Sequence, residues 1–314
     1  MNTSFTSLAA LALGAALLAW APAASAQELK AQPNQKFALL MSHMSNEFTV
    51  ELSGAVKEKA EELGASLNVF DARNEIARQI SQVETVVTQG YTGLVFEPVA
   101  IDGLAPALAA AKKAGLVVIN VNQKVANTEV IDSYVGANPI EGGEIEMDFV
   151  AKAIGGKGNV AFLLGPLGSD GQIGRTQGYE NILKNYPDIK VVYKQTANWR
   201  TDQALKLAEN WLQTGTEITA IVSNNDDMAL GAVKAVKDAQ LVGKVVIAGV
   251  DAAPNGLAAV KEGTMAATVS QNTVEQGHKA MEALVQLANG QKIEPVITVP
   301  HELITKENVD QYIK

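Results

Sequence analysis

The sequence predicts an α/β protein of two similar lobes, each built on a doubly wound parallel sheet. Short apolar runs alternate along the chain with helical segments of 10 to 15 residues, which is the pattern of βαβ units. The alternation restarts near Tyr134, as expected for a second lobe. Without its first 26 residues the 314-residue chain keeps 288 (314 − 26), enough for two domains of about 150 residues.

The first 26 residues have the features of a secretory signal peptide. They carry no charged side chain, and they contain an apolar run from Leu8 to Trp20 that ends in the small residues Ala24-Ser25-Ala26. This pattern predicts export and cleavage after Ala26. A membrane anchor is the alternative, but it needs about 20 apolar residues. The absence of Lys and Arg from Met1 to Ser7 is atypical of a signal peptide.

The first lobe is predicted from four strands with helices between them. Apolar residues spaced by threes and fours, from Phe48 to Leu63, predict the first helix. Asn74 is expected to cap the second helix. The predicted strands are 37–41, 67–70, 94–96 and 116–119, and a third helix is expected at about 102–114.

The second lobe repeats this order. Trp211 shares a helical face with Ala204, Leu207 and Ala208 and is therefore expected in the core. The predicted strands are 134–135, 159–164, 189–193, 218–222, 244–248 and 266–269. Helices are expected from about 140, at 170–185 and 201–214, from the 226 region to about 239, and at 273–288.

Composition excludes several kinds of function. The net charge of −9 and the lack of a basic stripe argue against nucleic-acid binding. The chain has no cysteine, which excludes disulfides, thiolate nucleophiles and cysteine-ligated zinc. Its three histidines show no metal-binding spacing, so His278 and His301 are expected to be structural. We expect a monomer without metal or cofactor.

Polar residues follow three of the predicted strands in the second lobe. The stretch Ser223–Gly231 comes directly after strand 218–222, and Asp251 and Gln271 end the next two junctions. An open α/β sheet binds its ligand outside the carboxyl ends of the strands, so these residues predict a cleft. A buried carboxylate such as Asp251 needs hydrogen-bond donors. Asp226 and Asp227 have another interpretation, as residues that begin the next helix and are favoured by its dipole.

Several segments resemble the periplasmic sugar-binding proteins of ABC importers, in their ribose-binding branch. These segments are FALLMSHMSNEF at 37–48, NNDDMALG at 224–231, IAGVD at 247–251 and TVSQN at 268–272. The segments MSH at 41–43, QTANW at 195–199 and VIAGVDA at 246–252 are more similar to the inositol- and rhizopine-binding members. The similarity runs through the whole chain after residue 26 in the same order.

The resemblance implies a type I periplasmic binding fold that closes around its ligand about a three-segment hinge. One lobe would hold residues 27–136 and 272–301, and the other 137–271 and 302–314. It also implies a periplasmic protein that performs no chemistry. Such a protein would bind a sugar or cyclitol and deliver it to a membrane-embedded permease.

Matching positions in that family imply the residues that hold the ligand. Asn225, Asp251 and Gln271 would bind hydroxyl groups, and Trp199 would cover the apolar face of the ring. Phe48 matches an aromatic position, but it could equally be a core residue of the first helix. The full set of candidate ligand-binding residues is Ser42, Asn46, Phe48, Asn74, Asn120, Asn122, Arg175, Trp199, Asn225, Asp251 and Gln271, and His43 could also reach the cleft.

Two departures from the ribose-type pattern bear on the ligand. Asn122-Gln123 stands where that pattern has Asp-Arg, and Ile173 replaces the first of two arginines, so that only Arg175 remains. These changes favour an inositol-type cyclitol or an amino-inositol. Another monosaccharide or alditol, such as ribose, xylose or galactose, is the alternative, and presentation of the ligand to a chemoreceptor is compatible with either.

Two other classes of function fit the sequence poorly. A dinucleotide-dependent enzyme would explain the glycines of Gly165–Gly171, but their G-x-x-G-x-x-G spacing is not the G-x-G-x-x-G of a nucleotide half. A sugar-responsive transcription regulator would need a basic DNA-binding headpiece where the predicted signal peptide stands.

Overall fold

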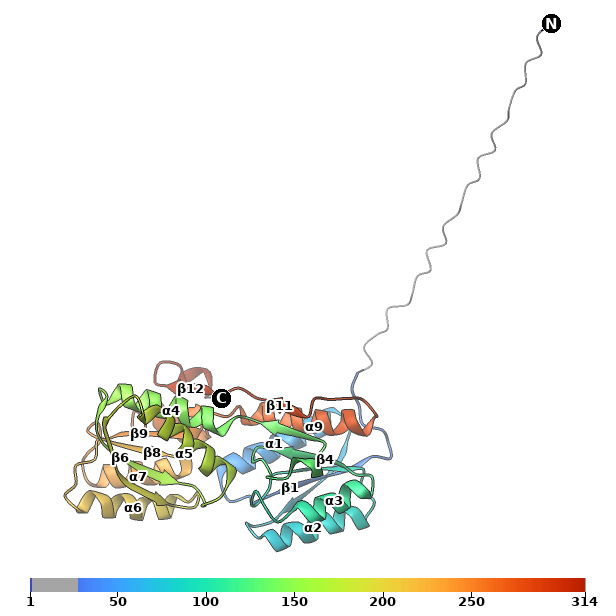
Figure 1. Cartoon of the computed structure of the whole chain (residues 1–314), viewed down its shortest axis with the longest axis horizontal. Coiled ribbons are helices and arrows are strands. Elements are labelled where there is room, and N and C mark those ends of the chain that lie inside the picture. The colour runs from blue at the N-terminus through green and yellow to red at the C-terminus, as the bar shows by residue number, and fades with distance from the viewer. Residues whose placement is uncertain (2–27, 314) are drawn as a thin grey trace.

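The chain forms two α/β lobes that lie side by side, each around a six-stranded sheet (Figure 1). This computed structural model describes Met1 and residues 28–313. The predicted signal peptide and its cleavage after Ala26 lie outside the described residues. The prediction of two similar α/β lobes with mostly parallel sheets is confirmed.

The N-terminal lobe holds a wholly parallel sheet with the strand order β11-β5-β4-β3-β1-β2. Its helices lie on both faces of the sheet, as a parallel sheet requires. The strands are β1 (Lys36–Met41), β2 (Ser66–Asp71), β3 (Gly93–Phe96), β4 (Val117–Val121), β5 (Ser133–Gly136) and β11 (Val296–Thr298), and the helices are α1 (Glu47–Glu62), α2 (Ile76–Thr88), α3 (Ala105–Lys113) and α9 (Thr273–Ala288).

The C-terminal lobe repeats this plan with the order β12-β10-β9-β8-β6-β7, in which β12 alone runs antiparallel to its neighbour. The strands are β6 (Lys157–Leu164), β7 (Asp188–Thr196), β8 (Ala220–Ser223), β9 (Val246–Asp251), β10 (Ala267–Ser270) and β12 (Glu302–Thr305), and the helices are α4 (Pro139–Ala153), α5 (Asp170–Leu183), α6 (Thr201–Gln213), α7 (Asp226–Asp238) and α8 (Pro254–Glu262). Two short 3₁₀ helices, Thr128–Val130 and Val309–Gln311, complete the described elements.

Three short segments connect the two lobes. The chain passes from β5 to α4, returns from β10 to α9, and passes again from β11 to β12. The side chain of Asn272, in the second segment, donates a hydrogen bond to the carbonyl of Pro300 in the third, at 2.8 Å. The second and third connections therefore lie side by side.

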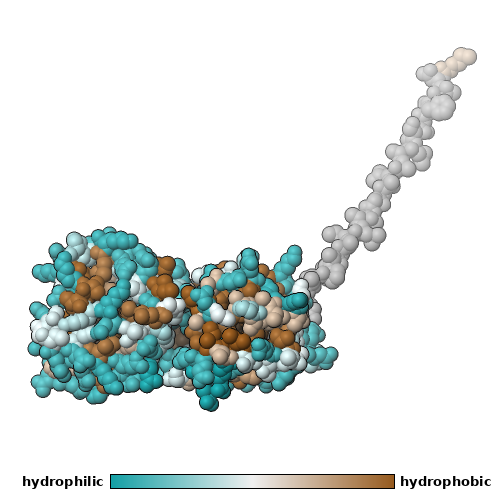
Figure 2. Space-filling model, turned by 60° about the horizontal axis from the view of Figure 1, so that its bottom comes forward, coloured by the Kyte–Doolittle hydropathy of each residue, from teal (hydrophilic) through white to brown (hydrophobic). Residues whose placement is uncertain are grey.

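Alternation of side chains along β1 gives the N-terminal lobe two hydrophobic layers. Phe37, Leu39 and Met41 pack with residues of α1 and α9, while Ala38 and Leu40 pack with residues of α2 and α3. A strand that is buried on both faces must be apolar throughout, which is why its sequence lacks an alternating pattern. In Figure 2 hydrophobic residues are visible at the surface of both lobes, with the more extensive group on this lobe.

The structure differs from the predicted elements at their ends and at the sheet edges. The prediction that Asn74 caps the second helix was wrong, since Glu75 occupies the N-cap of α2 and Asn74 lies in a turn with a φ of 61°. Strand β7 runs on to Thr196, beyond the predicted 189–193. The edge strands β11 and β12 were not predicted. Trp211 is buried, as expected, and only 2% exposed.

A buried polar network lies behind the carboxyl ends of the C-terminal strands. Glu146 on α4 accepts hydrogen bonds from the Tyr179 hydroxyl at 2.5 Å and from the backbone N–H of Ser223 at 3.2 Å. The Asn224 side chain donates to the Tyr179 oxygen at 3.2 Å. Burial raises the pKa of Glu146 to about 8 from an ordinary value of 4.5. The segment that follows β8 is thus held from behind by a carboxyl group that is protonated at neutral pH.

Replacement of Glu146 by glutamine is expected to reduce the pH dependence of stability. Because the native pKa lies above the unfolded value, this group stabilises the fold at low pH and loses that contribution as the pH rises toward 8. Glutamine keeps a side-chain oxygen that can accept from Ser223, places an amide group at the position of the second carboxyl oxygen, and does not ionise in this pH range. The stability of Glu146→Gln should therefore fall less steeply between pH 6 and 8, by up to about 1.4 kcal/mol per pH unit.

Thermal or urea unfolding at several pH values measures this slope, with the exposed Glu217→Gln as the control. An unchanged slope in Glu146→Gln would show that Glu146 is ionised in the native state.

Candidate functional site

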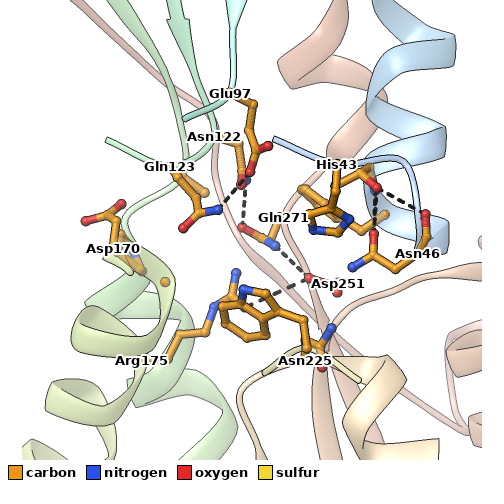
Figure 3. Close-up of a pocket in the computed structure, with 16 residues that line it drawn as sticks. His43, Asn46, Glu97, Asn122, Gln123, Asp170, Arg175, Asn225, Asp251 and Gln271 are labelled. Atoms are coloured by element: carbon orange, nitrogen blue, oxygen red, sulfur yellow. Dashed lines mark hydrogen bonds and ion pairs between the residues drawn. The ribbon is translucent and has the colours of Figure 1, made fainter. Parts of the chain in front are cut away.

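A pocket of about 480 Å³, including its opening to solvent, lies between the two lobes (Figure 3). The lining combines polar side chains with the two aromatic rings predicted to contact a ligand. Of the predicted ligand-binding residues, those that line it are Asn46, Phe48, Asn122, Arg175, Trp199, Asn225, Asp251 and Gln271.

Two helices, one from each lobe, begin at the pocket with an asparagine. Asn46 caps α1 by accepting from the N–H of Thr49 at 3.0 Å, and Asn225 caps α7 by accepting from the N–H of Met228 at 3.0 Å. Each cap uses its amide oxygen, which leaves the amide nitrogen as a hydrogen-bond donor. Asp226 and Asp227 are the first residues of α7, as one interpretation expected, but the cap itself is Asn225.

Asp226 has a structural role away from the pocket lining. It is fully buried, and it accepts hydrogen bonds from the Thr268 hydroxyl at 2.7 Å and from the backbone N–H of Ala253 at 3.0 Å. Burial, together with the neighbouring Asp251 carboxyl, raises its pKa well above its usual value. Asp226 thereby connects the start of α7 to β10 and to the loop after β9.

Asp251 lies at the centre of the pocket wall formed by the C-terminal lobe. Its Oδ1 accepts a hydrogen bond from Nε2 of Gln271 at 2.7 Å and is 4.0 Å from Nη1 of Arg175. It is only 4% exposed, and burial raises its pKa to about 7 although Arg175 acts in the opposite direction. The side-chain oxygen of Gln271 accepts from Asn122 at 3.2 Å, so one chain of hydrogen bonds joins both lobes.

Asp251 and Trp199 both adopt the left-handed backbone region, with φ of 134° and 60°. Such conformations cost about 1–3 kcal/mol each and persist where the surrounding structure imposes them. The indole of Trp199 lies against Gly165, where a Cβ atom would be 2.2 Å from the ring. Close packing against the indole therefore explains why position 165 is a glycine, without the dinucleotide-binding interpretation of Gly165–Gly171.

Phe48 satisfies both interpretations of its sequence position. It belongs to the hydrophobic core beside α1 and is 6% exposed, and it also lines the pocket. It therefore presents an apolar surface from the N-terminal lobe, while Trp199 presents one from the C-terminal lobe.

Three predicted residues do not line this pocket. The Asn120 side chain is used within its own loop, where it donates to the carbonyl of Gln123 at 2.8 Å and accepts from the N–H of Val125 at 3.1 Å. Ser42 is buried and its N–H donates to Glu97 at 3.1 Å. Asn74 lies in the turn before α2. These strand-end residues shape the loops around the pocket without facing it.

Two carboxylates of the lining were not among the predicted residues. Glu97 follows β3 and is 1% exposed; it accepts from the N–H of Ser42 and from Nε2 of Gln123, the latter at 2.8 Å. Asp170 begins α5, and burial raises its pKa. The argument from strand ends that selected Asp251 would also have selected Glu97. Among the described residues no group of three or more acidic, histidine or cysteine side chains is arranged to hold a metal ion.

The two lobes also touch on either side of the pocket. Glu47 at the start of α1 accepts from the N–H of Asn255 on α8 at 2.9 Å and from its side-chain amide. On the other side, the N–H of Lys124 donates to Asp170 at 3.1 Å. The structure therefore holds the lobes together around the pocket, and these contacts would have to break for the cleft to open.

Replacement of Gly165 by alanine is expected to displace the Trp199 indole, because the added methyl group would overlap the ring. The intrinsic fluorescence spectrum should shift, and stability should fall by about 1–3 kcal/mol. Gly54→Ala is the matched control, since nothing lies within 4 Å of a Cβ atom there. A Gly165→Ala spectrum identical to that of the wild type would contradict this account of the Trp199 position.

Comparison with known proteins agrees with this architecture. Residues 37–292 match the model of the periplasmic binding protein domain. The chain is 40% identical to the xylitol-binding protein of Mycolicibacterium smegmatis over 77% of this chain and 69% of that protein. It is 31% identical to a putative rhizopine-binding protein of Rhizobium meliloti, over 87% of this chain and 90% of that protein.

Solved structures show the same fold with ligands bound. An ABC transporter solute-binding protein from Bacillus halodurans, with bound myo-inositol, superposes with a TM-score of 0.85 at 34% identity, covering 88% of this chain and 97% of that one. The described part of the chain contains no helix long and apolar enough to cross a membrane. The chain belongs to the periplasmic binding protein domain family, among relatives that bind sugars and polyols.

Proposed function

We propose that this protein captures a sugar or cyclic polyol between its lobes by hinge closure and delivers it to an ABC importer. The favoured ligand is an inositol-type cyclitol or an amino-inositol. The proposal rests on the lining of a single pocket. Polar side chains from both lobes and the aromatic rings of Phe48 and Trp199 face the same space. Asp251, Asn225 and Gln271 would hold hydroxyl groups, and Phe48 and Trp199 would cover the C–H faces of the ring.

Closure about the three connecting segments would bury the ligand. The contacts of Glu47 with Asn255 and of Lys124 with Asp170 lie between the lobes, so they can form only when the lobes approach each other. Hinge motion about a few segments is the usual way in which two rigid lobes enclose a ligand. The lobe boundaries in this proposal are residues 27–136 with 272–301, and 137–271 with 302–314.

The proposed setting is the periplasm, after removal of a signal peptide that ends at Ala26. The protein would act as a monomer that carries out no chemical reaction, and its partner would be the membrane-embedded permease. The names of the relatives support this, because each is a binding or solute-binding protein.

Another monosaccharide or an alditol is the second candidate ligand. The relative with 40% identity is a xylitol-binding protein, and an open-chain polyol could offer the same row of hydroxyl groups to Asp251 and Asn225. Ribose, xylose and galactose belong to this alternative. A binding protein for any of these ligands could also present it to a chemoreceptor.

A thermal-shift screen of inositols, alditols, pentoses and hexoses tests the proposal. A ligand that binds only the folded protein raises the melting temperature. At a ligand concentration of a hundred times Kd, the free energy of unfolding increases by about 2.7 kcal/mol. At least one polyol or sugar should bind stoichiometrically and be recovered unchanged. No shift with any of them, or turnover of a bound compound, would contradict the proposal.

Asp251→Ala is expected to abolish tight binding of the hit, with little loss of fold, because it removes the central carboxylate of the pocket. The expected loss is about 2–5 kcal/mol of binding free energy. Titration calorimetry measures it, with the exposed Asp238→Ala as the control. Unchanged affinity in Asp251→Ala would remove Asp251 from the proposed binding site.

A further inference from the structure

The two walls of the pocket differ in charge. On the C-terminal wall, the Arg175 guanidinium faces the Asp251 carboxyl at 4.0 Å. On the N-terminal wall the described lining holds one carboxylate, Glu97, directly after β3. In Figure 3 Glu97 lies opposite Asp251 and Asn225, with the pocket between them. A ligand in this pocket therefore meets the Arg175–Asp251 pair and the Asp170 carboxyl on one side and the Glu97 carboxylate on the other.

Every contact that Glu97 makes in the described structure is with a neutral group. Its Oε2 accepts from the backbone N–H of Ser42 at 3.1 Å, and its Oε1 accepts from the Gln123 amide at 2.8 Å. Among the described residues, no lysine, arginine or histidine lies within 4.0 Å of this carboxylate. With two of about four acceptor positions filled, the carboxylate can accept further hydrogen bonds.

Neither His43 nor Lys124 forms an ion pair with the Glu97 carboxylate. His43 lines the pocket, but its Nδ1 lies 3.3 Å from the N–H of Ser45 and accepts a hydrogen bond from it. This ring nitrogen is thus engaged by its neighbour Ser45 rather than by Glu97. The ammonium of Lys124 is directed to the Tyr134 ring, 5.4 Å from its centroid, and Lys124 is not part of the lining.

A buried carboxylate is costly unless a charge of opposite sign or several hydrogen bonds compensate it. Glu97 is 1% exposed and has no cation of its own. Asp170, a second carboxylate of the lining, forms no ion pair within 4.0 Å among the described residues and accepts the backbone N–H of Lys124, although the positive charges of Arg175 and Lys124 act on it. The pocket is therefore short of positive charge, and a ligand can provide it.

We infer that the ligand is an amino-polyol whose ammonium group binds to Glu97, while its hydroxyl groups face Asp251 and Asn225. This inference rests on the proposed function and narrows its ligand to a cationic class. An ammonium group brings three donors and one charge, whereas a hydroxyl group brings one donor and no charge. Gln123 positions the carboxylate without neutralising it, which leaves the charge of Glu97 for the ligand.

Titration calorimetry at pH 7 with two matched pairs tests this inference. The pairs are scyllo-inosamine with scyllo-inositol, and 1-amino-1-deoxyxylitol with xylitol. For at least one pair the wild type should bind the amine at least about tenfold more tightly than the neutral compound, the effect of one charge-assisted hydrogen bond. In Glu97→Gln this ratio should fall to within about threefold, because the amide carries no charge.

Two further variants complete the test. Gln123→Arg places a guanidinium beside Glu97 and should also remove the preference for the amine. Glu84→Gln, on the exposed surface of α2, should retain it. Thermal unfolding of each variant confirms that it is folded. A preference that persists in both Glu97→Gln and Gln123→Arg would overturn the role of Glu97.

The outcomes separate this inference from the proposed function. If the wild type binds the neutral compounds as tightly as the amines, or more tightly, the inference fails and the proposed function stands. If none of the four compounds binds, the inference also fails. The proposed function fails with it only when the wider panel of sugars and polyols gives no ligand either.

Discussion

The constraint on which the site depends is the burial of the Asp251 carboxyl at the carboxyl end of β9. Among the described residues its one direct hydrogen-bond donor is Gln271, and Arg175 lies 4.0 Å away, so the charged form of Asp251 is incompletely compensated. Burial accordingly raises its pKa to about 7. Ligand hydroxyl groups that donate to this carboxylate would supply what the protein lacks, and a vacant cleft can satisfy Asp251 only by admitting water.

The surroundings of Asp251 explain how this arrangement is held. Gln271 belongs to one of the three connecting segments, and its oxygen accepts from Asn122 of the other lobe. Arg175 is fixed by the carbonyl of Asn224, whose side chain in turn contacts the Tyr179–Glu146 pair. The central carboxylate is thus linked to both the hinge and the interior of the C-terminal lobe. Closure of the lobes would alter the contacts of Asp251, Gln271 and Asn122 together.

Sequence patterns were sufficient for the architecture because the inner strands of both sheets are short and buried on both faces. The prediction was incomplete where the local signal is weak. Strands β11 and β12 are edge strands of three and four residues, and their pairing depends on partners far away in the chain. The position of Asn74 in a turn could not be read from its residue type, since asparagine suits both a cap and a positive φ.

The site was predictable to the extent that it follows strand ends. Asp251, Asn225 and Gln271 lie at or just after the carboxyl ends of strands, and the structure brings them to one pocket. Asn120 also lies near the end of a strand, but its side chain turns into the following loop, which only the tertiary structure reveals. Glu97 was not predicted, although it too follows a strand; the structure shows its buried carboxylate held by Ser42 and Gln123 at the pocket.

The central claim is that one polyol lies between the lobes and contacts both of them. A crystal structure of the protein with a saturating concentration of its tightest ligand tests this most directly. The account predicts density for one ligand between Phe48 and Trp199, with Asp251, Asn225 and Gln271 within hydrogen-bond distance of its hydroxyl groups. An empty cleft, with the ligand bound at another surface or to one lobe alone, would contradict it.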